Sequence, residues 1–357
     1  MEAGVAASLR PMRMALKIVA LAGLAATCLP AQAQSFPAKP VRIVVPFPIS
    51  GPPDIRGTPR MSRTYRLIAQ TAPPPISDTL ANIVVLALHP HATVTERLPG
   101  AVTTRGAHAV IRAPADGHTL LLGSNGTMVI NPHFFHGVEY DPPRDFVLVS
   151  PLATMPFVLL ARPGIPDSPE ALIEWLRLRP GEINYGSSGD GSTGHLAGEL
   201  FRRMARVHIV HASFNGGIAA LGGLAQRQVS LMFAALPLAL SYMPNEHFRA
   251  LAITSATRSR RIPAIPTLDE SGLRGFDVEG WYGIFARAGT PATALTWARE
   301  RIHAAVAESA TQAVLRAEGL EPATMSLEQF ATRINTEYDR WGPVLRASRL
   351  PHKDRAQ

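Results

Sequence analysis

Glycines and small hydroxyl side chains are concentrated in segment 184–195, which reads Asn-Tyr-Gly-Ser-Ser-Gly-Asp-Gly-Ser-Thr-Gly-His. The patterns around it predict a loop between a strand and a helix. Such a loop offers unpaired main-chain N–H groups, hydroxyls and the positive end of a helix dipole, and its glycines let a ligand approach closely. We therefore expect it to hold a carboxylate or similar small anion, with a purely structural glycine turn as the alternative. The expected binding residues are Ser187, Ser188, Gly189, Asp190, Gly191, Ser192 and Thr193.

Two sharper motifs fit this loop only in part. The spacing Gly189-x-Gly191-x-x-Gly194 matches a dinucleotide fingerprint, but the next predicted strand ends at Ser213 with no carboxylate to hold a ribose. An exported NADP-linked oxidoreductase, with Ser213 facing a 2′-phosphate, stays open as an alternative. A phosphate-binding loop needs a lysine after its second glycine, and Ser192 stands at that position. A hydrolase nucleophile turn needs the pattern Gly-x-Ser-x-Gly, which no serine of the loop has.

Metal and covalent chemistry find little support. His89 and His91, and likewise His133 and His136, have ligand-like spacings, but no third ligand accompanies either pair. The single cysteine, Cys28, excludes a disulfide framework and a cysteine-rich metal site. We expect no metal, no cofactor and no catalytic residues.

The basic character of the chain does not indicate nucleic-acid binding. The formal net charge is +8, and all but three of the 35 basic residues are arginines. They are scattered along the chain and do not alternate with aromatic residues, so no stacking platform is predicted.

The first 33 residues predict a secretory signal peptide. Basic residues precede the short apolar run 18–29, and Ala31-Gln32-Ala33 follows, so cleavage is expected after Ala33. A lipid anchor on Cys28 is the alternative, and Met14 is a second candidate start. Since no later stretch approaches the ~20 apolar residues of a membrane span, the mature chain is expected in the periplasm.

The remaining chain alternates short apolar runs with helical periodicities, which predicts an α/β fold. The expected strands are 41–47, 118–122 (followed by a loop at 123–126), 148–161, 183–185, 208–211, 229–234, 250–254 and 282–286. The expected helices are 80–88, one opening at Ser168-Pro169, 195–204, one opening at Thr290-Pro291, and one from Ser326 onward. In the last helix, Ser326 and Gln329 can form a capping box, and an apolar stripe from Leu327 to Leu345 should pack on a core.

Several motifs in series resemble one family. They are Pro37–Pro48, Ala113–Leu121, Ile130-Asn131-Pro132, Tyr140-Asp141-Pro142, Asp145-Phe146, the loop 186–193 with His195–Glu199, and Gly289-Thr290-Pro291. Together they resemble the solute-binding receptors of tripartite tricarboxylate transporters, the Bug-type family. The resemblance implies a two-lobed periplasmic binding protein (type II-like), each lobe a mixed sheet flanked by helices, hinged by two crossover strands. It implies lobe one at 36–155 plus 282–357 and lobe two at 156–281.

The family resemblance also implies a function and ligand contacts. The receptor would be a monomer without enzymatic activity that captures a small carboxylate between its lobes and delivers it to a membrane permease. Besides the 187–193 loop, the implied ligand-binding residues are Phe47, Pro48, Ser50, Gly51, Asp54, Ser124, Thr127 and Asn131.

The chain departs from the family pattern at three places. Residues 55–78 form an arginine-rich insert that separates Asp54 from the first helix, so either Asp54 or Asp78 could take the family's acidic position. The usual Tyr-Lys-Gly is Phe214-Asn215-Gly216, and an aspartate usual in a later strand is absent from 231–234. A degenerate receptor that folds without binding is therefore another alternative. We expect the insert to be a mobile basic loop at the mouth of the cleft.

Overall fold

The computed structural model describes residues 36–47, 76–89, 94–98, 103–135, 137–244 and 246–347. The predicted signal peptide and most of the predicted insert lie outside these residues. The described residues from Lys39 onward form one compact unit.

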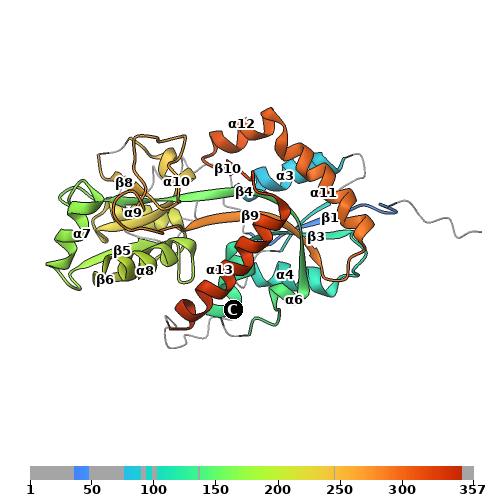
Figure 1. The fold of residues 1–357 in the computed structure, drawn as a ribbon, viewed down its shortest axis with the longest axis horizontal. Helices are drawn as coiled ribbons and strands as arrows, with labels where there is room; N and C mark the ends of the chain where they lie inside the picture. Colours follow the sequence, from blue (N-terminus) through green and yellow to red (C-terminus); the bar gives the residue numbers. More distant parts are fainter. Residues whose placement is uncertain are drawn as a thin grey trace, which may run out of the picture. The chain divides into compact units, whose positions relative to one another are not determined.

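Two mixed sheets share one long strand (Figure 1). The first sheet has the order β2-β1-β3-β9-β4-β10 and the second has the order β8-β4-β7-β5-β6. The strands are β1 (Arg42–Val45), β2 (Val94–Arg97), β3 (Thr119–Ser124), β4 (Phe146–Ala161), β5 (Ile183–Ser187), β6 (Ile209–Ser213), β7 (Leu231–Ala235), β8 (Arg249–Ile253), β9 (Glu279–Arg287) and β10 (Glu321–Pro322). β1 runs parallel to β2 and β3, and β5 runs parallel to β6 and β7.

Helices cover both sheets and define two lobes. The helices between β1 and β4 are α3 (Ile76–Leu88), α4 (Thr104–Arg112), the π-helical turn η2 (Gly126–Ile130), α5 (Asn131–Phe134) and α6 (Pro142–Asp145). Those of the second sheet are α7 (Pro169–Arg177), α8 (Thr193–Ala205), α9 (Gly217–Ala225) and α10 (Leu236–Ser241). After β9 follow α11 (Ala292–Ala307), α12 (Ser309–Ala317) and α13 (Leu327–Ala347). None of the helices within the described ranges is both long and apolar enough to cross a membrane.

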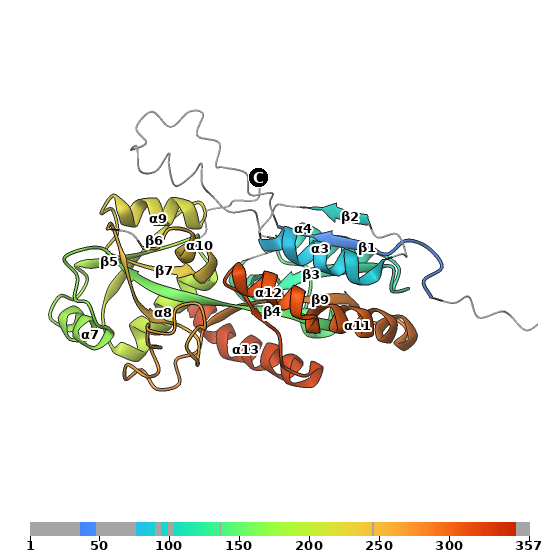
Figure 2. The same cartoon turned by 90° about the horizontal axis from the view of Figure 1, so that it is seen from above.

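The predicted crossover strand is confirmed, and its prolines are accommodated by irregular pairing. β4 pairs with β9 in the first sheet and with β7 and β8 in the second. Its register against β9 shifts between Leu148 and Ser150 and again between Pro151 and Ala153. Because proline cannot donate to a sheet ladder, irregular pairing near it is expected. β9 leads back from the second lobe, so two strands connect the lobes (Figure 2).

The predicted loop at 123–126 is wrong. Gly123 and Ser124 complete β3, and the chain then continues from Asn125 directly into η2 and α5. The apolar residues Met128, Val129 and Ile130 are buried there. Burial of these side chains favours a helix, although the preceding Gly-Ser-Asn-Gly sequence is typical of a loop.

The predicted capping box at the start of α13 is confirmed. Gln329 N–H donates to the Ser326 hydroxyl at 3.1 Å, and Ser326 N–H donates to the Gln329 side-chain oxygen at 2.9 Å. The apolar stripe places Phe330, Trp341 and Leu345 in the core, and α13 packs on η2, α5 and β4.

Ser326→Ala is expected to lower the free energy of unfolding by about 1 kcal/mol, because the Gln329 N–H loses its hydroxyl acceptor. Urea denaturation measures the change. The matched control is Ser309→Ala at the start of α12, where no side-chain cap bond forms. Equal losses in the two variants would contradict the assigned role of the cap.

Candidate functional site

The β5–α8 loop lies at the carboxyl ends of parallel strands, where α/β proteins commonly bind ligands. Its glycines Gly189 and Gly191 have φ of 140° and 73°, a region that disfavours other residues. Gly191 N–H donates to Nδ1 of His195 at 3.0 Å, and Ser192 N–H donates to the Gly189 carbonyl at 3.1 Å. These bonds fix the loop as a rigid turn onto α8.

The first turn of α8 carries the donors that remain. The Ser192 hydroxyl caps the helix by accepting from His195 N–H. The N–H groups of Thr193 and Gly194 have no hydrogen-bond partner among the described residues. Since such orphan donors coincide with the positive end of the helix dipole, this turn favours an anion.

Close packing fixes α8 against its sheet. A Cβ on Gly194 would lie 2.5 Å from the main-chain oxygen of Phe233 in β7, and one on Gly198 would lie 2.1 Å from the Tyr185 ring in β5. Neither approach leaves room for a side chain. The two glycines therefore let the helix lie low enough to place its first turn at the loop.

A polar cluster faces inward in the first lobe. The hydroxyls of Thr103 and Thr127 lie 2.9 Å apart, and the Asn131 amide donates to Thr103 at 3.1 Å. Ser124 accepts from Thr127 N–H at 3.4 Å. Of the predicted residues, the structure thus brings Ser124, Thr127 and Asn131 together. Thr103 was not predicted; its positive φ of 74° has no signal in the sequence.

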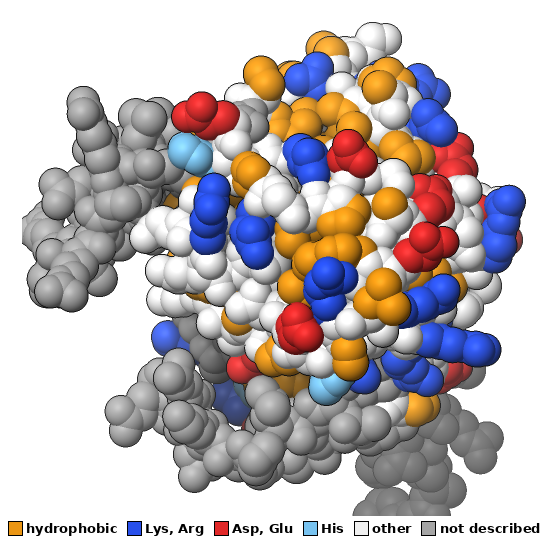
Figure 3. Space-filling model, turned by 90° about the vertical axis from the view of Figure 1, so that its left-hand side faces the viewer, with side chains coloured by type: hydrophobic (Ala, Val, Ile, Leu, Met, Phe, Trp, Pro, Cys, Tyr) orange, Lys and Arg blue, Asp and Glu red, His pale blue; other side chains and the backbone are white. Residues whose placement is uncertain are grey.

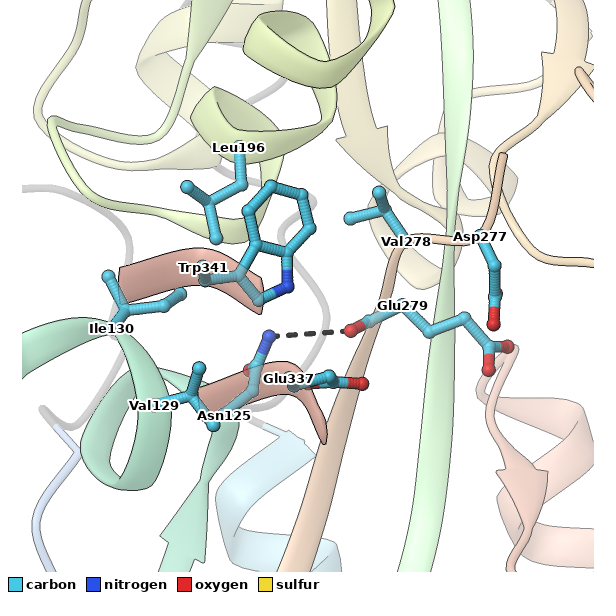
Figure 4. Close-up of a pocket in the computed structure, with 9 residues that line it drawn as sticks. All are labelled: Asn125, Val129, Ile130, Leu196, Asp277, Val278, Glu279, Glu337 and Trp341. Atoms are coloured by element: carbon cyan, nitrogen blue, oxygen red, sulfur yellow. Dashed lines mark hydrogen bonds between the residues drawn. The ribbon is translucent and has the colours of Figure 1, made fainter. Parts of the chain in front are cut away.

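Asn125 and Phe134 join the two lobes. Asn125 lies within the segment 124–127 expected at the ligand but was not itself named as a binding residue, and Phe134 was not predicted. The Asn125 amide donates to the Thr193 hydroxyl at 3.0 Å and to the Glu279 carbonyl at 3.3 Å (Figure 4). The Phe134 ring meets the His195 ring edge-on at 6.2 Å and covers Gly191. These contacts place the predicted residues of the second lobe opposite those at the end of β3.

The remaining predicted residues are only partly described. Phe47 follows β1 and meets the Tyr282 ring edge-on, with centroids 5.8 Å apart. Pro48, Ser50, Gly51 and Asp54 lie outside the described residues. Asp78 lies in the first turn of α3, where it forms an ion pair with Arg97 of β2.

Asp190, His195 and His211 converge beside the loop, with candidate ligand atoms within 4.8 Å of one another. However, the two imidazole rings are stacked, with centroids 4.0 Å apart and planes 11° from parallel. A zinc ion lies about 2.0–2.1 Å from a ligating histidine nitrogen and near the plane of its ring, and two parallel stacked planes do not share such a point. This arrangement is therefore not a metal centre. Burial lowers the pKa of His195, and burial together with His195 lowers the pKa of His211 to about 4.

A buried ion network lies where β9 meets α13. Arg333 contacts Glu279 at 3.0 Å and Glu337 at 2.8 Å, and Trp281 Nε1 donates to Glu337 at 2.8 Å. Burial raises the pKa values of both glutamates, although Arg333 opposes the shift. Beside the network is a cavity of about 10 Å³, room for about one water, lined by Asn125, Val129, Ile130, Leu196, Asp277, Val278, Glu279, Glu337 and Trp341 (Figure 4).

Charges on the outer face of the second lobe are mixed. On the face in Figure 3, arginine and acidic side chains are interspersed among apolar ones. That face therefore presents no uniformly basic patch.

Comparisons with known proteins agree on one family. Residues 85–350 match the family model described as the tripartite tricarboxylate transporter family receptor. The chain is 30% identical to Protein BugT of Bordetella pertussis over 330 residues, covering 92% of this chain and 94% of that protein.

Solved structures show the same fold. A structure described as R. palustris Rpa4515 with adipate matches with a TM-score of 0.70 and 30% identity, covering 87% of this chain and 97% of that one. MatC from Rhodopseudomonas palustris with bound malate matches with a TM-score of 0.66 and 27% identity, covering 87% and 100%. The predicted two-lobed binding-protein fold is confirmed.

Proposed function

The chain belongs to the tripartite tricarboxylate transporter receptor family, and from this premise we propose that it captures a small carboxylate between its lobes for transport. One observation carries the proposal: the N–H groups of Thr193 and Gly194, which have no partner among the described residues, belong to the turn that Asn125 of the first lobe contacts. A carboxylate between the lobes would accept hydrogen bonds from these groups. The related structures contain adipate and malate, which are small carboxylates.

The finer assignments belong to the same proposal. Ser188, Ser192 and Thr193 would contribute from the second lobe, and the Ser124–Thr127–Asn131 cluster with Phe47 from the first. The buried Ser187 hydroxyl would shape the loop. The lobes would divide at 36–155 plus 282–357 and 156–281. We further propose export through cleavage after Ala33, a monomeric receptor without enzymatic activity, and delivery to a membrane permease.

The dinucleotide alternative gains no support from the loop. The N–H groups of Gly189 and Gly191 donate within the loop, and the Phe134 ring lies against Gly191. A pyrophosphate would need these amides and this approach. No observation favours an oxidoreductase over a receptor.

A thermal-shift screen with mono-, di- and tricarboxylates, including adipate and malate, tests the proposal. A true ligand at 100 times its dissociation constant should stabilise the protein by about 2.7 kcal/mol, which raises the melting temperature by roughly 4 °C. NADP is the negative control. No response across the panel would contradict the receptor function. Rescue of binding by deletion of 55–78 would instead identify a receptor blocked by its insert.

A further inference from the structure

The hydroxyl of Ser187 lies at the centre of a short hydrogen-bonded chain. It lies 3.0 Å from the Gly189 carbonyl, to which it donates, and it accepts from Gly189 N–H at 3.2 Å. It also lies 2.7 Å from Nε2 of His211. On the far side of that ring, Nδ1 of His211 lies 3.5 Å from a carboxylate oxygen of Asp190.

Neither neutral form of His211 satisfies all of these contacts. With its proton on Nε2, the ring donates to Ser187, but the Nδ1 lone pair faces the Asp190 carboxylate. With its proton on Nδ1, the ring donates to Asp190, but Ser187 must then donate to Nε2, and its oxygen faces the Gly189 carbonyl. Only the doubly protonated imidazolium donates to Ser187 from Nε2 and also presents a positively charged Nδ1–H edge to the Asp190 carboxylate 3.5 Å away, while Ser187 donates to Gly189.

The surroundings of His211 oppose that charge. The ring is stacked on His195 of α8 and lies 5.0 Å from the Tyr185 ring of β5. Glu199, also on α8, is the second nearby acid, but it is engaged by Arg202 at 2.8 Å and by the Tyr185 hydroxyl at 3.0 Å. Burial and His195 keep the pKa of His211 low, so the ring is neutral at pH 7.

An anion at the first turn of α8 changes this balance. His195 belongs to that turn and its ring is stacked on His211, so a carboxylate held at the turn would lie next to the imidazole pair. Opposite charges interact strongly at such distances in a partly dry site. The acceptor for Nε2 is already in place at 2.7 Å, and the Asp190 carboxylate lies 3.5 Å from Nδ1 as a counter-charge.

We propose that carboxylate capture by this loop takes up one proton, which is held by His211 between Ser187 and Asp190. The proposal rests on the proposed function and deepens it: Asp190 and His211 become positioning residues that make affinity depend on pH. The same side chains are those of a serine hydrolase triad, but Ser187 has 0% exposure and cannot reach a substrate carbonyl.

Isothermal titration calorimetry with adipate and, separately, malate tests the linkage at pH 6.0 in buffers of different ionisation enthalpy. We expect the wild type to take up between about 0.5 and 1 proton per ligand, and the dissociation constant to rise with pH by up to about tenfold per unit until the bound-state pKa is passed. Asp190→Asn, which changes a half-exposed side chain, should reduce the uptake to near zero. His211→Gln should do the same, provided its melting transition stays cooperative.

The matched control is His208→Gln, which changes an exposed histidine three residues before His211 and should leave the uptake unchanged. Binding without proton uptake in the wild type, or unchanged uptake in Asp190→Asn, would overturn the linkage while leaving the receptor function intact. Absence of binding by both probes at every pH, together with no response across the wider carboxylate panel, would overturn the proposed function and the linkage with it.

Discussion

Gly194→Ala is expected to weaken carboxylate binding about 10- to 100-fold, equivalent to ~1.4–2.8 kcal/mol. The added Cβ would lie 2.5 Å from the Phe233 main-chain oxygen, which belongs to the interior of β7 and cannot rotate away. The first turn of α8 must therefore move off the sheet, and the donors at Thr193 and Gly194 lose their alignment. Overpacking of this kind also costs about 1–3 kcal/mol of stability, partly offset by the better helix propensity of alanine.

The affinity of Gly194→Ala is compared with that of the wild type by titrating adipate and malate into each protein, and the melting curve of each protein is recorded. Gly217→Ala is the matched control, since a Cβ at this first residue of α9 would meet only the flexible end of Leu238. Wild-type affinity in Gly194→Ala together with a lowered melting temperature would show that the first turn of α8 can be displaced without loss of binding, and so does not position the ligand.

Arg333→Met is expected to destabilise the protein by about 3–5 kcal/mol at pH 7, because two buried carboxylates lose their shared counter-charge. Glu279 and Glu337 both lie within 3.0 Å of the guanidinium, and both side chains are mostly buried. Their position between β9 and α13 makes this network part of the connection between the lobes. Denaturation with urea measures the loss.

The pH dependence distinguishes charge from packing in this variant. Both glutamates have pKa values raised by burial, and the loss of Arg333 must raise them further. A raised folded-state pKa costs stability as pH rises through it, so the deficit of Arg333→Met should shrink from pH 7 to pH 5. Arg274→Met removes a largely exposed ion pair with Asp269 and should cost less than about 1 kcal/mol. A deficit in Arg333→Met that does not depend on pH would contradict the electrostatic account.

Local patterns were sufficient to predict the elements that position the loop. The Ser168-Pro169 start and the Ser326–Gln329 box are signals that act within one helical turn, and both are found in the structure. The strand 148–161 was predicted across its prolines because its apolar run is long enough to dominate, and the irregular register accommodates them.

Contacts between distant segments could not be predicted in the same way. Asn125 meets Thr193 only because β3 and β5, in different sheets, end opposite each other. The positive φ of Thr103 and the π-helical turn at Gly126–Ile130 are imposed by packing. Threonine does not favour a positive φ, and the sequence 126–130 carries no signal for a π-helix. In the ion network, Arg333 pairs with Glu337 four positions later and with Glu279, which is 54 positions earlier in the sequence. Only the pair four positions apart is visible in the sequence, as a helical spacing.

The most direct test of the account observes the Gly194 amide itself. Thr193-Gly194 is the only Thr-Gly pair in the sequence, so labelling with ¹³C′-threonine and ¹⁵N-glycine selects a single amide resonance. Addition of adipate or malate should shift that resonance strongly downfield as the N–H donates to the carboxylate. A ligand that binds in the same tube while the Gly194 resonance stays in place would contradict capture at the first turn of α8.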